Sequence, residues 1–363
     1  MLVYIHVPFC STRCRYCAFF SNPLGRGVDP VSSPLVRDYV DTLFMEMAHW
    51  GDRLSGSTVE SVFFGGGTPS LLPPRVIGHI MERLGRYFKL AHKAEVTLEA
   101  NPESLRGGHR VTQYLEAGIN RLSIGIQSLD DSMLRMLGRP HKAQDSLHAA
   151  FLAREAGCAN INVDLMWGLP GQSVRQWLQT LKDVMRMSPD HISAYGLTVE
   201  PGTPLELDVE DGRLILPTER DQNIMFMEGA ALLEQQGYLH YEISNFARMG
   251  FQCRHNMGYW EGEDYLGFGP SATSTIGGQR WTNPASQRAW DMRARDGSLG
   301  QEVEVLDAQT RVLELLMLRL RTSRGLQVKA YREMTGRDFV RDHQRLVQAL
   351  HENGLIRIRN GYL

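Results

Sequence analysis

An alternation of short apolar runs with amphipathic segments, which continues to about residue 200, is the strongest constraint on the fold of this chain. The apolar, β-branched runs predict six strands: Leu2–Val7, Val59–Phe64, Ala94–Ala100, Arg121–Ile126, Ile161–Trp167 and His191–Leu197. The segments between them predict helices: Leu35–Trp50, Pro74–Phe88, Gly107–Ala117, Ala143–Ala156 and Val174–Met187. Strands that alternate with helices form a parallel α/β sheet with right-handed crossovers, so we expect either a doubly wound sheet or a partial (βα)6 barrel.

Polar and glycine-rich residues follow every one of the six predicted strands. They are Cys10–Cys17, Gly65–Pro69, Glu99–Glu103, Gln127–Ser128, Asp164 with Gly168–Gly171, and Thr198–Gly202. Because parallel strands end on the same edge, these residues are expected to lie close together. Barrels of alternating strands and helices build their active sites at this carboxyl edge. The sequence therefore predicts a functional site there.

Composition adds a few limits. A chain of 363 residues is long for a single core, so one large and one smaller domain are expected. The 39 basic and 41 acidic residues nearly cancel, which gives no indication of a nucleic-acid partner. No apolar run approaches the roughly 20 residues of a membrane span. The first residues carry no basic segment typical of a signal peptide, so we expect a cytoplasmic protein.

Three regions are expected. Residues 1–205 form the barrel, residues 206–300 an extension and linker, and residues 301–363 a small helical domain of winged-helix type. Within the extension, Gly250–Trp260 is predicted to be irregular. The last region is predicted to contain helices at Gln309–Arg321, Val328–Thr335 and Arg341–Asn353 and a terminal strand at Leu355–Arg359.

Three of the five cysteines, Cys10, Cys14 and Cys17, are clustered near the start of the chain. So few cysteines in a long chain do not indicate a disulfide framework, whereas clustered thiols indicate metal ligands. Three thiolates suit either zinc, with one more ligand, or a [4Fe–4S] cluster with one open iron. Cys253 and His255 are candidates for a fourth protein ligand. The run Gly65–Gly67 would allow close approach of an anion or amino-acid group.

The spacing Cys-x3-Cys-x-aromatic-Cys, with Tyr16 as the aromatic residue, and the glycine run before Thr68 resemble the radical S-adenosylmethionine (SAM) superfamily. The resemblance implies that Cys10, Cys14 and Cys17 ligate a [4Fe–4S] cluster whose open iron is chelated by the SAM amine and carboxylate. It also implies that electron transfer from the reduced cluster cleaves the sulfonium to a 5′-deoxyadenosyl radical. The family fold is a partial six-unit barrel, which agrees with the strand count above.

Further segments resemble the oxygen-independent coproporphyrinogen III oxidase group: Tyr4–Cys10, Phe64–Pro69, Gly125–Ser128, Gly138–His141 and Val163–Gly171. This resemblance extends over most of the chain, including a C-terminal domain of that group's type. The SAM-binding residues that the resemblance implies are Tyr4, Tyr16, Gly66, Gly67, Thr68 and Glu99, with Gln127, Arg139 and Asp164 at positions that hold a second SAM in the oxidase.

Two departures separate the chain from the oxidase. Only three residues precede Tyr4, and Phe19 stands where the oxidase has a further cysteine. Instead, His255-Asn-Met-Gly-Tyr-Trp260 matches the His-Asn-x-x-Tyr-Trp motif of the HemW branch of haem chaperones. That resemblance implies haem binding, with His255 as an axial ligand and Tyr259 and Trp260 as flat apolar surface. From the residues alone, a hydrogen-bonded loop with aromatic side chains that fill the gap between domains is the favoured explanation of the motif, and Cys253 is a competing soft ligand.

Three functions stay open from the sequence. The first is a haem chaperone that binds a cluster, SAM and haem and delivers haem to respiratory proteins, with contact to membrane proteins only at the periphery. An electron donor would be needed if SAM is cleaved. The second is an oxidase that decarboxylates coproporphyrinogen III, or another radical enzyme acting on porphyrins. The third is a zinc-stabilised barrel with a binding role.

Overall fold

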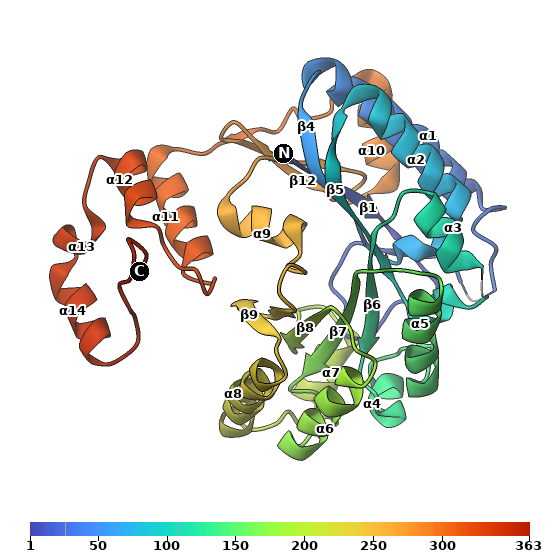
Figure 1. Ribbon diagram of the computed structural model, residues 1–363. Coiled ribbons are helices and arrows are strands. Elements are labelled where there is room, and N and C mark those ends of the chain that lie inside the picture. Colours follow the sequence, from blue (N-terminus) through green and yellow to red (C-terminus); the bar gives the residue numbers. More distant parts are fainter. Residues whose placement is uncertain (26, 108) are drawn as a thin grey trace.

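The computed structural model describes residues 1–25, 27–107 and 109–363. Residue 108, which falls within the third predicted helix, lies outside the described residues. All six predicted strands are confirmed, and they lie side by side in chain order (Figure 1). They are β1 (Leu2–Val7), β4 (Thr58–Gly66), β5 (Lys89–Ala100), β6 (Arg121–Gln127), β7 (Ile161–Trp167) and β8 (His191–Gly196). Each pairs in parallel with the next, so the sheet is a partial barrel and not doubly wound.

Helices cover the convex side of this sheet (Figure 1). They are α1 (Pro34–Arg53), α2 (Pro74–Tyr87), α3 (Arg110–Glu116), α4 (Asp131–Met136), α5 (Ala143–Glu155) and α6 (Val174–Met185). Helix α1 begins with a proline at a first-turn position and buries Tyr39, Leu43 and Met47 on one face. Helix α6 begins with a capping box between Ser173 and Gln176. Of these helices, only α4 was absent from the sequence prediction.

The segment after residue 203 extends the sheet at both edges. Strand β10 (Asn245–Ala247) pairs antiparallel with β8, and β9 (Leu239–Glu242) lies outside it. At the other edge, β11 (Tyr265–Phe268) is parallel to β1 and is followed by β12 (Thr273–Ile276), β13 (Gln279–Thr282) and β14 (Glu304–Val305). The helices of this segment are α7 (Pro204–Glu210), α8 (Glu219–Gln235), α9 (Arg254–Glu261) and α10 (Gln287–Asp296).

The prediction of an irregular segment at Gly250–Trp260 is wrong, because Arg254–Glu261 form helix α9. Its first turn receives no side-chain hydrogen bond from its own N-cap residue, Cys253. The acceptor comes instead from Glu95 on β5, which no local pattern reveals. The helix ends at Gly262, whose left-handed backbone (φ 70°) suits glycine.

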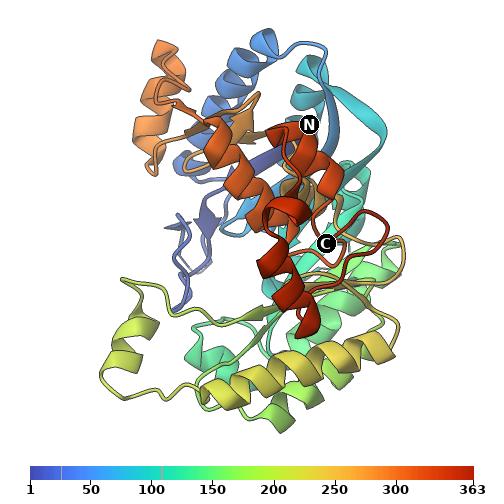
Figure 2. The ribbon, with the colours of Figure 1, turned by 90° about the vertical axis from the view of Figure 1, so that its left-hand side faces the viewer.

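The C-terminal region contains α11 (Ala308–Arg319), α12 (Val328–Thr335), α13 (Phe339–Asp342) and α14 (Gln344–Glu352). These helices have a small core of their own around Leu326, Tyr331, Phe339 and Val347. Figure 2 shows them in front of the concave side of the barrel. The predicted strand Leu355–Arg359 is wrong: Arg359 forms only an isolated bridge to Tyr362, in a tight turn with no neighbouring strand to pair with. Among the helices that the structure describes, none is long and apolar enough to cross a membrane.

Glu46 on α1 joins the barrel to the extension at the edge next to β1. Its buried carboxylate accepts hydrogen bonds from Gly269 N (2.8 Å), Asn283 Nδ2 (2.7 Å) and Trp290 Nε1 (3.0 Å). Burial raises the pKa of Glu46 to about 7, and the three hydrogen bonds counteract part of that rise.

The replacement Glu46→Ala is expected to lower the free energy of unfolding by about 2–4 kcal/mol, because three buried donors lose their acceptor. Urea denaturation measures this change, with Glu82→Ala on the exposed face of α2 as the control. The folded pKa of about 7 exceeds the ordinary value of 4.5. The contribution of this carboxyl to the free energy of unfolding therefore decreases as the pH rises from 4.5 to about 7. The variant Glu46→Gln, which cannot ionise, is expected to lack this decrease. Equal stability of Glu46→Ala and the control would contradict this role.

Candidate functional site

The three clustered cysteines lie in the loop that follows β1. Cys10 ends the short strand β2 (Phe9–Cys10), which pairs with β3 (Asn22–Pro23) and closes the loop at its base. Within the loop, Cys17 N donates a hydrogen bond to Cys14 O at 3.3 Å. All three cysteines carry free thiols and line one cavity of about 400 Å³ at the carboxyl ends of the barrel strands.

Two side chains, one from just after the end of β4 and one from the loop after α4, contact these thiols. Thr68 Oγ1 donates to Cys10 Sγ at 3.7 Å, and Arg139 Nη1 donates to Cys14 Sγ at 3.5 Å. Arg139 is held in place by Asn101 Oδ1 at 2.5 Å and Gly125 O at 2.8 Å. Burial raises the pKa of the Cys10 thiol, so the thiolate needs such donors or a bound metal to be stable.

Two glycines at the end of β4 keep the wall beside the cysteines open. A Cβ on Gly67 would lie 2.6 Å from Phe9 O and 3.0 Å from Cys10 Sγ. Gly66 has a φ of +108°, and a Cβ there would lie 2.6 Å from the His6 ring. Both positions therefore require glycine, and both line the cavity. Backbone amides at such a wall can approach a bound amine or carboxylate closely.

Two carboxyl groups also form part of the cavity wall. Glu99 ends β5, and Asp164 lies on β7, where it accepts hydrogen bonds from Asn162 Nδ2 (2.7 Å) and Ser123 Oγ (3.0 Å). Burial, with the nearby charge of Asp164, raises the pKa of Glu99 to about 8. Burial also raises the pKa of Asp164. The carboxyl of Glu99 is therefore mostly neutral at pH 7, and a cationic ligand beside the two groups would favour their ionised forms.

Eleven of the twelve residues predicted from the sequence for the cluster and SAM line this one cavity: Cys10, Cys14, Tyr16, Cys17, Gly66, Gly67, Thr68, Glu99, Gln127, Arg139 and Asp164. Gln127 has a φ of 65°, a strained backbone that is typical of functional sites. The twelfth residue, Tyr4, lines a neighbouring cavity instead. Residues that the sequence reasoning missed include Ser123 and Met166, which the two-residue period of their strands would have placed on this face.

The donor set indicates what this site holds. Among the described residues, no three His, Cys, Asp or Glu side chains converge on a position for one metal ion. The three thiols thus do not share one tetrahedral position, whereas a [4Fe–4S] cluster would take each thiolate on a different iron. Neither Cys253 nor His255 lines the cavity, so neither serves as a fourth ligand there. The open space beside Gly66 and Gly67 fits a ligand on the remaining iron.

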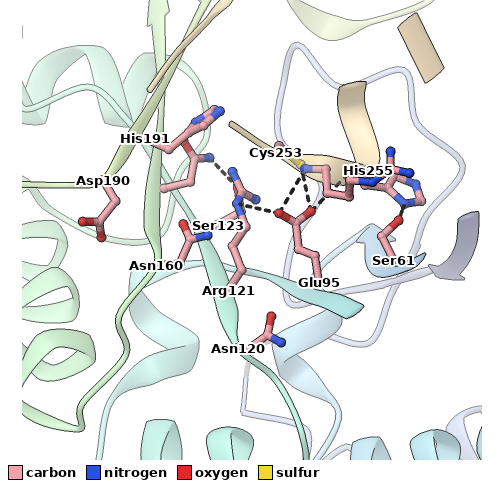
Figure 3. Close-up of polar contacts among 12 residues, drawn as sticks. Ser61, Glu95, Asn120, Arg121, Ser123, Asn160, Asp190, His191, Cys253 and His255 are labelled. Atoms are coloured by element: carbon pink, nitrogen blue, oxygen red, sulfur yellow. Dashed lines mark hydrogen bonds and ion pairs between the residues drawn. The ribbon is translucent and has the colours of Figure 1, made fainter. Parts of the chain in front are cut away.

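His255 lies beside Ser61 of β4 and Glu95 of β5 in the barrel interior (Figure 3). It is 1% exposed and sits on α9, on the concave side of the sheet. Its Nδ1 is 2.8 Å from Ser61 Oγ, and its buried Nε2 has no hydrogen-bond partner among the described residues. Burial lowers the pKa of His255 to about 3, so the ring is neutral at pH 7.

Helix α9 is held against the sheet by Glu95 of β5 (Figure 3). The carboxylate accepts hydrogen bonds from Arg254 N (3.0 Å), His255 N (3.2 Å) and Cys253 Sγ (3.3 Å). Arg121 lies 4.0 Å from the same carboxylate, and both side chains are largely buried. Burial raises the pKa of Cys253 to about 12, which keeps this thiol protonated and inert.

Helix α9 thereby closes a second cavity of about 190 Å³ inside the barrel. His255, Asn256 and Tyr259 form its α9 side, and it shares lining residues such as Asp164 with the first cavity. Ligand pockets typically measure about 300–1,000 Å³. The volume of this cavity alone lies below that range. The role of His255 as an axial haem ligand stays a prediction. Trp260, in contrast, lines a separate groove toward α11.

Comparison with known proteins agrees with this architecture. A model described as the radical SAM superfamily matches residues 4–184, and one described as the HemN C-terminal domain matches residues 306–363. The haem chaperone HemW of Bacillus subtilis is 33% identical over 355 residues, which cover 97% of this chain and 92% of the relative. The chain belongs to the HemW branch of the radical SAM superfamily.

Two further relatives complete this comparison. Haem chaperone HemW of Escherichia coli is 38% identical over 274 residues, which cover 76% of this chain and 70% of the relative. Radical S-adenosyl methionine domain-containing protein 1, mitochondrial, of Bos taurus is 44% identical over 274 residues. That match covers 74% of this chain but only 59% of the length of the bovine protein.

A solved structure supports the fold. Coproporphyrinogen III oxidase (HemN) from Escherichia coli, a radical SAM enzyme, matches with a TM-score of 0.81 over 99% of this chain and 85% of its own. The sequence identity of 23% limits this likeness to the fold. The α/β radical SAM barrel and the C-terminal helical domain expected from the sequence are thus confirmed for this HemW-branch protein.

The replacement Glu95→Ala is expected to loosen α9, because it removes the acceptor of two backbone amides and leaves Arg121 unpaired. A loss of about 3 kcal/mol of local stability corresponds to on the order of a hundredfold faster amide exchange in α9. Hydrogen–deuterium exchange measures this rate. The exposed replacement Glu116→Ala should leave the rate unchanged. Full protection of α9 in Glu95→Ala would show that the cap is dispensable.

Proposed function

We propose that this protein is a haem chaperone that holds a [4Fe–4S] cluster and SAM in its barrel and delivers haem to respiratory haemoproteins. The observation that carries the proposal is the convergence of three thiols, the glycine wall and two buried carboxyls on one cavity. The HemW names of relatives that cover most of the chain support the haem part. A cytoplasmic location, where thiols stay reduced, belongs to the proposal.

Different residues of the cavity would hold the cluster and SAM. Cys10, Cys14 and Cys17 would hold the cluster, and Arg139 would keep a positive charge beside Cys14. When bound and reduced, such a cluster supplies the electron that cleaves the SAM sulfonium, for which the protein would need an electron donor. The wall at Gly66 and Gly67 leaves space for the amine and carboxylate of SAM. The remaining residues proposed to bind SAM are Tyr4, Tyr16, Thr68, Glu99, Gln127 and Asp164.

A second candidate is the oxidase reaction on coproporphyrinogen III, which the HemN-like fold would accommodate. One residue of the cavity argues against it. Phe19 lines the cavity and is 67% exposed, and it occupies the position at which the oxidase group has a further cysteine. A phenyl ring offers neither a thiol nor a proton there. We therefore favour transfer of haem over turnover of a porphyrinogen.

The cluster assignment is tested by Cys14→Ala after anaerobic reconstitution. The wild type is expected to contain about four irons and four sulfides per chain. The variant should lose most of both, because one iron loses its thiolate, while Cys158→Ala, at a buried apolar cysteine outside the cavity, should keep them. Iron and acid-labile sulfide analysis gives the readout. Stoichiometric zinc without sulfide in the wild type would contradict the assignment.

The choice between chaperone and oxidase is tested with reconstituted protein, SAM, a reductant and coproporphyrinogen III. We expect no catalytic release of protoporphyrinogen, and we expect stoichiometric binding of added haem followed by its transfer to an apo-cytochrome of the b type. Chromatography of the porphyrins and the absorbance of the acceptor provide the two measurements. Multiple turnovers to protoporphyrinogen would establish the oxidase function instead.

A further inference from the structure

A groove of about 380 Å³ lies between α9, the β11–β13 edge of the sheet and α11. At one end, Arg319 Nη2 of α11 donates a hydrogen bond to Glu261 O at the end of α9, at 3.0 Å. At the side of the sheet, Arg280 of β13 forms two hydrogen bonds with Glu314 of α11, at 2.7 and 3.1 Å. The walls are therefore fixed to each other, and the volume falls in the range of about 300–1,000 Å³ typical of ligand pockets.

The walls of this groove are mainly apolar and include two sulfur atoms. Trp260 of α9 presents its indole on one side, and Leu315 and Leu318 of α11 lie on another. Met317 on α11 is 50% exposed, and Met334 on α12 is 41% exposed, although both are apolar. Two exposed thioethers beside an aromatic ring provide soft iron ligands and a flat surface together.

Among the described residues, two charged side chains of the groove have no oppositely charged partner within 4.0 Å: the carboxylate of Asp264 and the guanidinium of Arg311. Glu261 lies 3.7 Å from Arg319, Glu314 lies 2.7 Å from Arg280, and Glu263 lies 2.9 Å from Arg254. The remaining acid, Asp264, accepts a hydrogen bond from Gly277 N at 3.1 Å. Within the part of the chain that the structure describes, Arg311 has no acidic partner within 4.0 Å.

The residues of the His-Asn-x-x-Tyr-Trp motif point to opposite sides of α9. His255 and Asn256 line the second cavity in the barrel, whereas Trp260 lines the groove. Tyr259 lines both spaces. Its ring packs edge-to-face with the rings of His255 and Tyr265, with distances between ring centroids of 4.8 and 4.7 Å. The aromatic half of the motif is thus the half that faces the groove.

We propose that haem binds in this groove, flat against Trp260, with a thioether of the pair Met317 and Met334 as an axial iron ligand and a propionate paired with Arg311. Haem combines a flat apolar body with two carboxylates, which matches an apolar groove with one unpaired arginine. Thioether sulfur is an established haem ligand in proteins. His255 then orients α9 through Ser61 and does not bind iron. This inference rests on the haem-chaperone function proposed above.

The test is a haem titration of the reconstituted full-length protein, followed by absorbance and electron paramagnetic resonance. The wild type is expected to show the far-red charge-transfer band of thioether-ligated ferric haem. The double variant Met317→Leu/Met334→Leu keeps the apolar volume but should lose this band and bind haem on the order of tenfold more weakly. Arg311→Gln should weaken binding severalfold without changing the spectrum. Met292→Leu, an exposed methionine on α10, is the matched control.

The outcomes separate this inference from the function on which it rests. If the wild type binds no haem, the chaperone function itself fails. If the wild type binds haem and the double methionine variant has the same affinity and spectrum, the groove assignment is overturned and the chaperone function stands. The substituted side chains are exposed, so the variants are expected to fold.

Discussion

The carboxylate of Glu95 determines where α9 lies, and both spaces beside α9 depend on that position. A helix of eight residues has little stability of its own, and its first amide groups need an acceptor. Glu95 provides that acceptor from the middle of β5, and Arg121 of β6 balances its charge. Because the helix is fixed on the concave side of the sheet, the barrel interior is closed at its amino end. The outer face of the same helix becomes a wall toward α11.

The barrel interior between the cysteine loop and α9 is polar, and most of its groups are paired. Asp164 accepts from Asn162, whose Oδ1 lies 2.6 Å from His191 Nδ1. His191 Nε2 is 2.7 Å from Tyr241 Oη, which in turn accepts from Cys253 N at 3.3 Å. Burial lowers the pKa of His191, so the ring is neutral and acts as one donor and one acceptor. A continuous chain of hydrogen bonds therefore connects the carboxyl wall of the first cavity to the start of α9.

The sequence predicts the strands and the site residues wherever the pattern that reveals them lies within a short stretch of chain. The alternation of strand and helix identified all six barrel strands, and the residues at their carboxyl ends identified the cavity, because both follow from short-range periodicity. Helix α9 was missed because its cap comes from a residue 159 positions away along the chain. The SAM-binding role of Tyr4 is implied by resemblance alone. Its hydroxyl lies 3.2 Å from His6 Nδ1 beside the second cavity, a position that strand periodicity does not reveal. The groove between α9 and α11 could not be predicted from the sequence, because it forms only when these two helices, which are distant along the chain, lie side by side.

Tyr259 contributes to the wall of the barrel cavity and to the wall of the groove. One ring that belongs to both walls makes the two spaces thermodynamically linked for any pair of ligands that position the ring differently. Linkage is reciprocal: the factor by which occupancy of the barrel changes affinity in the groove equals the factor for the reverse effect. A single aromatic side chain would then give a carrier protein the means to hold its cargo in one state of the barrel and release it in another.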